Sequence, residues 1–273
     1  MKSVACIALC LVLLSGGAVW GKNLQTRNEV PGKSVGKSGV QRTVRTFSPE
    51  ETQALGRAMY LQDQAAASAT DILLAQVPDL SAYPVEGWIV SMEDGGHVIT
   101  FVGTHQGELR AMFAVRPEAS DVRRLNDLGY RRLTEEEEGQ FKARKTTLGL
   151  ISQWCSDSYN SIILPAPGGN AQLIYWMAAT SEPNVALVGG HYRFTVSNDW
   201  QRVEREEQLF SSCLRLGTKG MPENAALFAA QPLSDAPLET HVFLQLQLKK
   251  AFVVQTENDA LWEITNGVIS PVK

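Results

Sequence analysis

Short runs with alternating apolar and polar residues dominate this 273-residue chain, and Gly-bearing links separate many of them. Runs of this kind joined by short links are typical of antiparallel sheets, because a reversal of the chain needs only a few turn residues. The predicted strands cover Glu86–Glu93, His97–Gly103, Glu108–Val115, Tyr159–Leu164, Ala171–Ala179, Gly190–Ser197, Trp200–Leu209, Thr240–Leu248, Ala251–Gln255, Ala260–Thr265 and Val268–Ile269. We therefore expect about 9 to 11 strands, most of them antiparallel.

Two predicted helices interrupt the strands, and each begins with a capping box. Ser48-Pro49-Glu50-Glu51 starts the first helix, whose apolar spacing continues to Val77. Thr134-Glu135-Glu136-Glu137 starts the second, which we expect to reach Trp154. The predicted fold class is α+β: a predominantly antiparallel sheet with two long helices, in a body spanning 48–273 with possible subdomains 48–120 and 134–273.

The first 21 residues have the layout of a secretory signal peptide. Lys2 supplies the positive start, Val4–Leu14 is an apolar run, and Ser15–Ala18 is a stretch of small residues. A transmembrane helix needs about 20 apolar residues, and this run is much shorter. We expect cleavage after Ala18 or Gly21, a periplasmic or secreted location, and no integral membrane segment in the mature protein. A lipid anchor on Cys10 is disfavoured because a leucine precedes it.

Signal cleavage changes the cysteine inventory. Cys6 and Cys10 leave with the signal, so that Cys155 and Cys213 remain. Two cysteines exported together into an oxidising compartment are most simply a disulfide. Closing a loop of about 60 residues stabilises a fold by about 4 kcal/mol. We prefer this interpretation to a catalytic thiol, because neither cysteine lies in a recognisable nucleophile motif.

Charge is distributed unevenly along the chain. Residues 22–47 carry six basic residues against Glu29, and the absence of an apolar period predicts a disordered basic arm with a charge of +5. From residue 48 onward, 18 basic and 28 acidic residues give the body a charge of −10. An acidic body, with a basic arm that lacks the interleaved aromatic residues of a base-stacking platform, argues against a nucleic-acid partner. The arm is either a contact for anionic lipid or acidic protein, or a plain linker.

No catalytic or metal-binding motif lies on a suitable element. Gly32–Gly36 matches the G-x-S-x-G pattern, but the pattern needs a strand-to-helix turn and this match lies in the arm. The four histidines show no zinc-ligand spacing. Glu135–Glu138 lack the alternating oxygen ligands of a calcium loop and are interpreted as the first turn of a helix. We expect no cofactor and no metal.

Strand parity selects His191 and His241 as candidate acid/base residues. In the predicted strand Thr240–Leu248, leucines and Val242 share one face, whereas His241 lies on the other face, two residues after Glu239. His191 likewise lies opposite the apolar face of its strand. If the two strands are neighbours, His191, His241 and Glu239 form a charge-paired acid/base site. The interpretation that we prefer makes both histidines exposed residues on the wet face of a sheet.

One loop is a further candidate site. Pro165, Pro167, Gly168 and Gly169 form a shaped turn that is either a binding loop or an ordinary strand connection.

Together these observations favour an exported, non-enzymatic binding or accessory protein, such as an inhibitor or immunity-type protein, that acts on a protein or envelope partner. The first alternative is a secreted hydrolase that uses His191, His241 and Glu239, with Asp157 and Tyr159 nearby. The second alternative is a small-ligand binder with a pocket near Trp176. The oligomeric state is left open.

Overall fold

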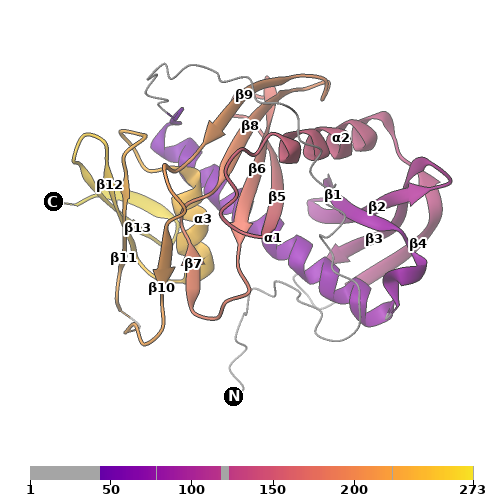
Figure 1. The fold of residues 1–273 in the computed structure, drawn as a ribbon, viewed down its shortest axis with the longest axis horizontal. Helices are drawn as coiled ribbons and strands as arrows, with labels where there is room; N and C mark the ends of the chain where they lie inside the picture. The colour runs from indigo at the N-terminus through magenta and orange to yellow at the C-terminus, as the bar shows by residue number, and fades with distance from the viewer. Residues whose placement is uncertain (1–43, 78, 118–122, 223, 273) are drawn as a thin grey trace, which may run out of the picture.

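The structure is a computed structural model that describes residues 44–77, 79–117, 123–222 and 224–272 (Figure 1). The predicted signal peptide and residues 22–43 of the predicted arm lie outside the described residues. None of the helices within the described ranges has the length and apolar character needed to cross a membrane.

The α+β class with mostly antiparallel sheets is confirmed. The helices are α1 (Pro49–Gln76), the short 3₁₀ helix η1 (Leu80–Ala82), α2 (Glu135–Gly149) and α3 (Glu239–Leu248). The strands are β1 (Val85–Glu93), β2 (Gly96–His105), β3 (Glu108–Pro117), β4 (Arg123–Arg132), β5 (Ser158–Pro165), β6 (Ala171–Ala179), β7 (Val185–Leu187), β8 (Tyr192–Ser197), β9 (Val203–Gln208), β10 (Arg215–Gly217), β11 (Leu227–Gln231), β12 (Phe252–Thr256), β13 (Leu261–Thr265) and β14 (Val268–Pro271).

Three four-stranded sheets hold most of these strands. The N-terminal sheet has the order β1-β2-β3-β4, the central sheet β5-β6-β8-β9, and the C-terminal sheet β11-β12-β13-β14. Strands β7 and β10 form a separate antiparallel pair. Every pair is antiparallel except β11 with β12.

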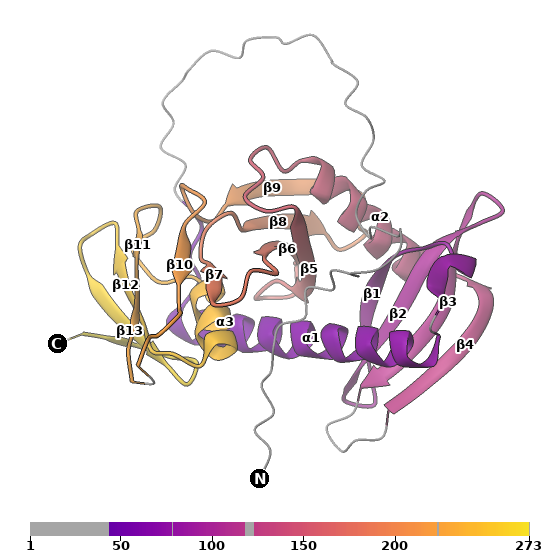
Figure 2. The ribbon, with the colours of Figure 1, turned by 60° about the horizontal axis from the view of Figure 1, so that its bottom comes forward.

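Helix α1 connects the three sheets. Figure 2 shows it passing from α3 and the C-terminal sheet, along the central sheet, to the β1–β4 sheet. Its predicted capping box is present, since the Glu51 N–H donates to Ser48 Oγ and the Ser48 N–H donates to Glu51 Oε2. Leu55 and Met59 enter the core of the C-terminal half, whereas Leu73 packs with the N-terminal sheet. One long helix therefore contributes to two hydrophobic cores.

Gln62 of α1 completes the free edge of β5. Its Nε2 donates to the Ile163 carbonyl at 3.0 Å, and its Oε1 accepts from the Ile163 N–H at 2.8 Å. β5 is an edge strand, and an unpaired strand edge exposes backbone donors and acceptors. The amide of Gln62 thus takes the place that a neighbouring strand would fill.

The prediction of a strand at Thr240–Leu248 is wrong, because this segment is helix α3. The first seven residues of α3 are all buried, so the helix has no polar face that would reveal its period. The helix links β11 to β12, which are parallel neighbours, and parallel neighbours need a crossover connection. The alternation of leucine and polar residues was therefore no guide to a sheet face.

Further differences concern strands and boundaries. Strands β4, β7, β10 and β11 were not predicted: β4 is rich in arginine, and β7 and β10 have three residues each. The second capping box, at Thr134, is confirmed, but α2 ends at Gly149 rather than at Trp154. Val44–Phe47, which we predicted in the disordered arm, pack on the body, with Val44 and Phe47 buried.

Candidate functional site

The face of β8 that we predicted to be wet is covered. Every residue of β8 is buried. His191, just before the strand, is 1% exposed; His241 is 1% exposed and Glu239 is 0% exposed. The preferred interpretation of the two histidines as exposed sheet residues is therefore wrong: the α3 segment is a helix packed within the core rather than a strand beside solvent.

Arg193 of β8 is the centre of a buried polar cluster. Its Nε donates to Glu207 Oε2 at 2.9 Å, and its Nη1 donates to Glu239 Oε1 at 2.6 Å. Burial would lower the pKa of Arg193, but the charge of Glu239 and the hydrogen bond and charge of Glu207 outweigh burial and raise this pKa above its ordinary value. The guanidinium therefore stays charged and holds both carboxylates in place.

Tyr175 of β6 completes this cluster. Its hydroxyl and the Oε2 atom of Glu239 are both buried, and neither has a hydrogen-bond partner of regular geometry among the described residues. Burial, and then the charge of Glu239, raise the pKa of Tyr175 well above its ordinary value. The Tyr175 hydroxyl therefore stays neutral close to the carboxylate of Glu239.

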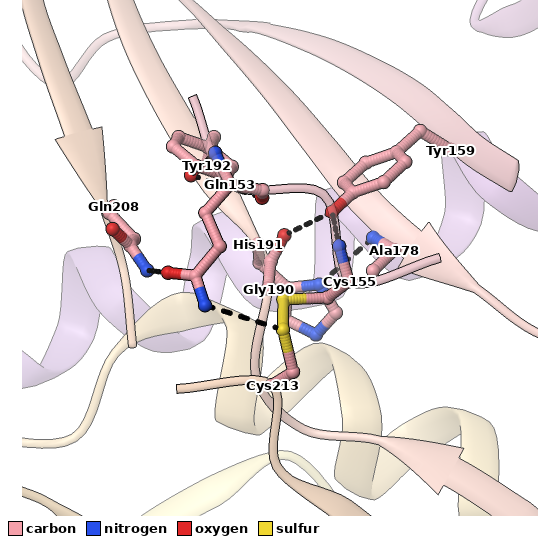
Figure 3. The surroundings of a disulfide bond; sticks show 9 residues. All are labelled: Gln153, Cys155, Tyr159, Ala178, Gly190, His191, Tyr192, Gln208 and Cys213. Carbon is pink, nitrogen blue, oxygen red and sulfur yellow. Dashed lines mark hydrogen bonds between the residues drawn. A yellow bond between two sulfur atoms is a disulfide. The ribbon is translucent and has the colours of Figure 1, made fainter. Parts of the chain in front are cut away.

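His191 is held by backbone groups through both ring nitrogens. Its Nδ1 accepts from the Ala178 N–H at 3.0 Å (Figure 3). Its Nε2 donates to the Leu187 carbonyl at 3.1 Å. Burial lowers the pKa of His191 to about 4. A neutral imidazole in this place joins the end of β6 to the end of β7.

His241 has a similar setting at the start of α3. Its Nδ1 accepts from the Leu238 N–H at 2.9 Å, which provides the cap of the helix. Burial, followed by the charge of His191, lowers the pKa of His241 to about 3. The structure therefore brings His191, His241 and Glu239 into one buried region, but the carboxylate of Glu239 pairs with Arg193 rather than with an imidazole.

The Cys155–Cys213 disulfide is present, with a Cα–Cα distance of 5.2 Å (Figure 3). The Tyr159 hydroxyl accepts from the Cys155 N–H and donates to the Gly190 carbonyl, each at 3.0 Å. Gly190 has a φ of +87°, and a Cβ at this position would lie 2.4 Å from Cys155 Cβ. Tyr159, a proposed neighbour of the histidines, thus supports the disulfide, and Asp157 is exposed.

The candidate loop 165–169 is the connection between β5 and β6. Gly168 and Gly169 have φ values of +85° and +70°, and the Ala166 N–H donates to the Ala171 carbonyl. The Asn198 side chain donates to the Gly169 carbonyl at 2.9 Å. The loop is thereby tied to the turn between β8 and β9.

Side chains fill the surroundings of Trp176, where we placed a ligand pocket. The guanidinium of Arg144 lies 5.1 Å from the ring centroid of Trp176 and 5.0 Å from that of Trp88. Trp176 Nε1 donates to Thr147 Oγ1 at 3.0 Å. Burial lowers the pKa of Arg144 to about 10. Arg144 therefore occupies, as a cation between two indoles, the space that a ligand would need.

One surface was missed by the sequence analysis: the outer face of the C-terminal sheet. Register places Phe228, Val253, Glu263 and Ser270 in one row across the four strands. Ala230, Gln255 and Leu261 form the next row, and Thr265 and Val268 a third. We call these nine residues the outer face.

The outer face is exposed and carries large apolar side chains among polar ones: Gln255, Glu263, Thr265 and Ser270 are the polar members. Phe228 is 53%, Val268 49% and Leu261 41% exposed, and Val272 just after β14 is 46% exposed. Glu263 is the one charged residue among the nine. The opposite face of the sheet holds the fully buried Phe252 and Val254. Apolar residues at successive positions of these strands, such as Leu227-Phe228 and Phe252-Val253, were the sequence signal for two apolar faces.

Within the described ranges, no group of three or more His, Cys, Asp or Glu residues is arranged to hold a metal ion. No protein-family model matches this chain, and no curated protein or solved structure is significantly similar to it. The functional argument therefore depends on the geometry of the chain itself.

Proposed function

We propose that this protein is an exported, non-enzymatic binding protein that docks a protein partner through the outer face. The exposed large apolar side chains of the outer face, Phe228, Leu261 and Val268, are the observation that carries the proposal. Exposed apolar patches on soluble proteins mark interaction sites. The disulfide supports export, because disulfides persist in oxidising compartments.

The charge of the body indicates the chemistry of the partner. The body has a net charge of about −10, which favours a basic partner, and the outer face carries a single carboxylate, Glu263. A basic partner with an apolar patch fits both features. Burial of apolar side chains would supply affinity, and the acidic charge of the body would accelerate encounter with such a partner.

The hydrolase alternative receives less support from the geometry. One carboxylate oxygen of Glu239 accepts a hydrogen bond from Arg193, and the Nδ1 atom of each histidine accepts a hydrogen bond from a backbone N–H. A general base must reach the proton that it removes, and these groups are at most 1% exposed. Loss of a measured turnover in a His191→Ala variant that keeps its fold would favour the hydrolase instead.

The test compares two exposed apolar sites in pull-downs from envelope extract. Phe228→Ser with Leu261→Ser changes the outer face, whereas Leu61→Ser changes an equally exposed leucine on α1, 57% exposed. We expect the wild-type protein and Leu61→Ser to retain the same stoichiometric partner and the outer-face variant to lose it. Equal retention by all three proteins, or no stoichiometric partner at any salt concentration, would contradict the proposal.

A further inference from the structure

The chain enters the body through a four-residue segment, Val44–Phe47, which we call the strap. Its two ends are buried, Val44 at 7% and Phe47 at 9% exposure, whereas the side chain of Arg45 faces solvent. The Val44 N–H donates to the Leu233 carbonyl at 3.0 Å. The strap is thus an extended peptide with two apolar anchors three positions apart.

Side chains, rather than a strand, bind the peptide group of Arg45. Its N–H donates to Glu207 Oε1 at 2.7 Å, and its carbonyl accepts from Arg193 Nη2 at 2.5 Å. A carboxylate and a guanidinium therefore recognise both polar groups of one residue's main chain. The main-chain contacts exclude only proline at this position. The exposed Arg45 side chain adds a contact within the strap, since its Cζ lies 5.0 Å from the ring centroid of Phe47.

An aromatic side chain completes the recognition. The Cζ atom of Arg193 lies 4.9 Å from the ring centroid of Phe47, a distance typical of a cation–π contact. Beside the ring is a small apolar hollow whose walls include Pro237, Trp262 and Ile269. We call the residues that contact the strap, namely Glu207, Arg193, Leu233 and the walls of this hollow, the strap groove. The strap groove therefore selects an aromatic residue two positions after the residue whose main chain is bound.

The receptor groups are positioned by contacts that do not involve the strap. Glu207 is paired with Arg193 and, through Oε1, with Arg205 Nε at 3.0 Å; Arg193 is also paired with Glu239. A preorganised site loses little entropy when it binds. Buried ion pairs are weak sources of stability compared with apolar packing of the same volume, so this cluster is better suited to recognition than to stability.

We propose that the strap groove is a peptide-binding site, that the strap is its intramolecular ligand, and that an extended segment of a partner protein displaces it. The partner segment carries an aliphatic residue and, three positions later, an aromatic residue. This site is separate from the outer face, so either proposal can fail without the other.

The test uses a fluorescein-labelled peptide with the sequence of residues 43–49 and the full-length Phe47→Ala variant, in which the strap has lost its aromatic anchor. We expect the variant to bind the peptide about tenfold or more tightly than the wild-type protein, measured by fluorescence anisotropy. Two matched peptides are the controls: one with alanine in place of phenylalanine, and one N-methylated at the arginine so that it cannot donate to Glu207. Both should bind about tenfold more weakly.

Equal affinity for the parent and N-methylated peptides, or no binding by a Phe47→Ala variant with native far-UV circular dichroism, would overturn the proposal. Dimerisation of the wild-type protein that the peptide reverses would assign the groove to the strap of a second copy instead. If Phe47→Ala does not fold, hydrogen exchange of the wild-type protein decides. The Arg45 amide should exchange faster than the amides of β6, and exchange only by global unfolding would overturn the proposal.

Discussion

Arg193 and Glu239 form a completely buried ion pair, with side-chain exposures of 0% and 1% and a distance of 2.6 Å between Nη1 and Oε1. The two residues come from β8 and from α3, which belong to the central sheet and to the crossover of the C-terminal sheet. The pair therefore ties these two parts of the fold together, and the strap depends on the same guanidinium.

Removal of the Arg193 charge should be strongly destabilising. Arg193→Met leaves Glu207 and Glu239 buried without their shared cation, which costs about 3–5 kcal/mol. Arg205→Met is the matched control: it removes the half-exposed partner of the same Glu207 and should cost about 1 kcal/mol or less. Urea unfolding followed by circular dichroism gives both values. If both variants lost a similar free energy of unfolding, the buried ion pair would contribute no more to stability than the half-exposed one.

Gly56 of α1 should not tolerate alanine. A Cβ there would lie 2.5 Å from Val242 Cβ and 2.7 Å from the Glu239 carbonyl oxygen of α3. Gly56→Ala should therefore force the two helices apart, with a cost of about 2–3 kcal/mol despite the better helix propensity of alanine. The control, Gly149→Ala, meets no atom within 4 Å and should be neutral or slightly stabilising. Thermal melts measure the melting temperature of both variants. A melting temperature for Gly56→Ala at or above that of the wild-type protein would contradict this close packing.

The buried histidines should make the fold sensitive to acid. Their pKa values, about 4 for His191 and about 3 for His241, lie below the ordinary value of 6.5, so the unfolded chain binds protons first as the pH falls. Their contribution to the free energy of unfolding is therefore highest above pH 6.5, where both histidines are neutral in either state, and it falls progressively as the pH falls toward 4. His191 alone accounts for about 3 kcal/mol of this loss. Urea unfolding at a series of pH values measures the slope. If either imidazole titrated near pH 6.5 by NMR in the folded protein, its pKa would not be lowered by burial and the predicted acid sensitivity would be refuted.

Asp63 of α1 should have the opposite effect. Burial raises its pKa from 3.8 to about 6, although hydrogen bonds with Gln64 and Asn160 act against this. The charged carboxylate therefore destabilises the fold above pH 6, and its protonation between pH 6 and pH 4 restores stability. We expect Asp63→Asn to stabilise the protein by about 1–2 kcal/mol at pH 8 and to have no effect below pH 4. A gain that does not change with pH would mean that ionisation of Asp63 is not the cause.

The disulfide should contribute mainly through the unfolded chain. It joins residues 58 positions apart, so that its loss in a Cys155→Ser, Cys213→Ser variant should cost about 4 kcal/mol. Guanidinium unfolding of the variant and of the oxidised wild-type protein gives the difference. The wild-type protein in reductant should match the variant, and a discrepancy between them would point to strain introduced by the serines.

The elements that could be predicted from the sequence are those with local signals. The capping boxes at Ser48 and Thr134 satisfy backbone donors within one turn, so that both helix starts were predicted correctly. Gly-bearing turns identified the β1–β2 and β2–β3 hairpins of the N-terminal sheet in the same way. The pairing of Cys155 with Cys213 followed from their being the two cysteines outside the predicted signal peptide.

The candidate site depended on contacts between distant segments, and there the prediction failed. Whether Glu239–Leu248 is a strand or a helix depends on the parallel pairing of β11 with β12, which no local pattern reveals. The surroundings of His191 depend in turn on α3 covering that side of the central sheet. Arg193 was not singled out at all, because its partners Glu207 and Glu239 are 14 and 46 positions away.

The sequence by itself determined the α+β class, the starts of α1 and α2 and the disulfide, because each depends on neighbouring residues or on a count. Only the tertiary structure decided which polar residues are buried, which face of the C-terminal sheet stays exposed, and that the strap is held by Arg193 and Glu207. These features arise from contacts across long sequence separations, and burial is a property of what covers a residue, which its neighbours in the chain do not specify.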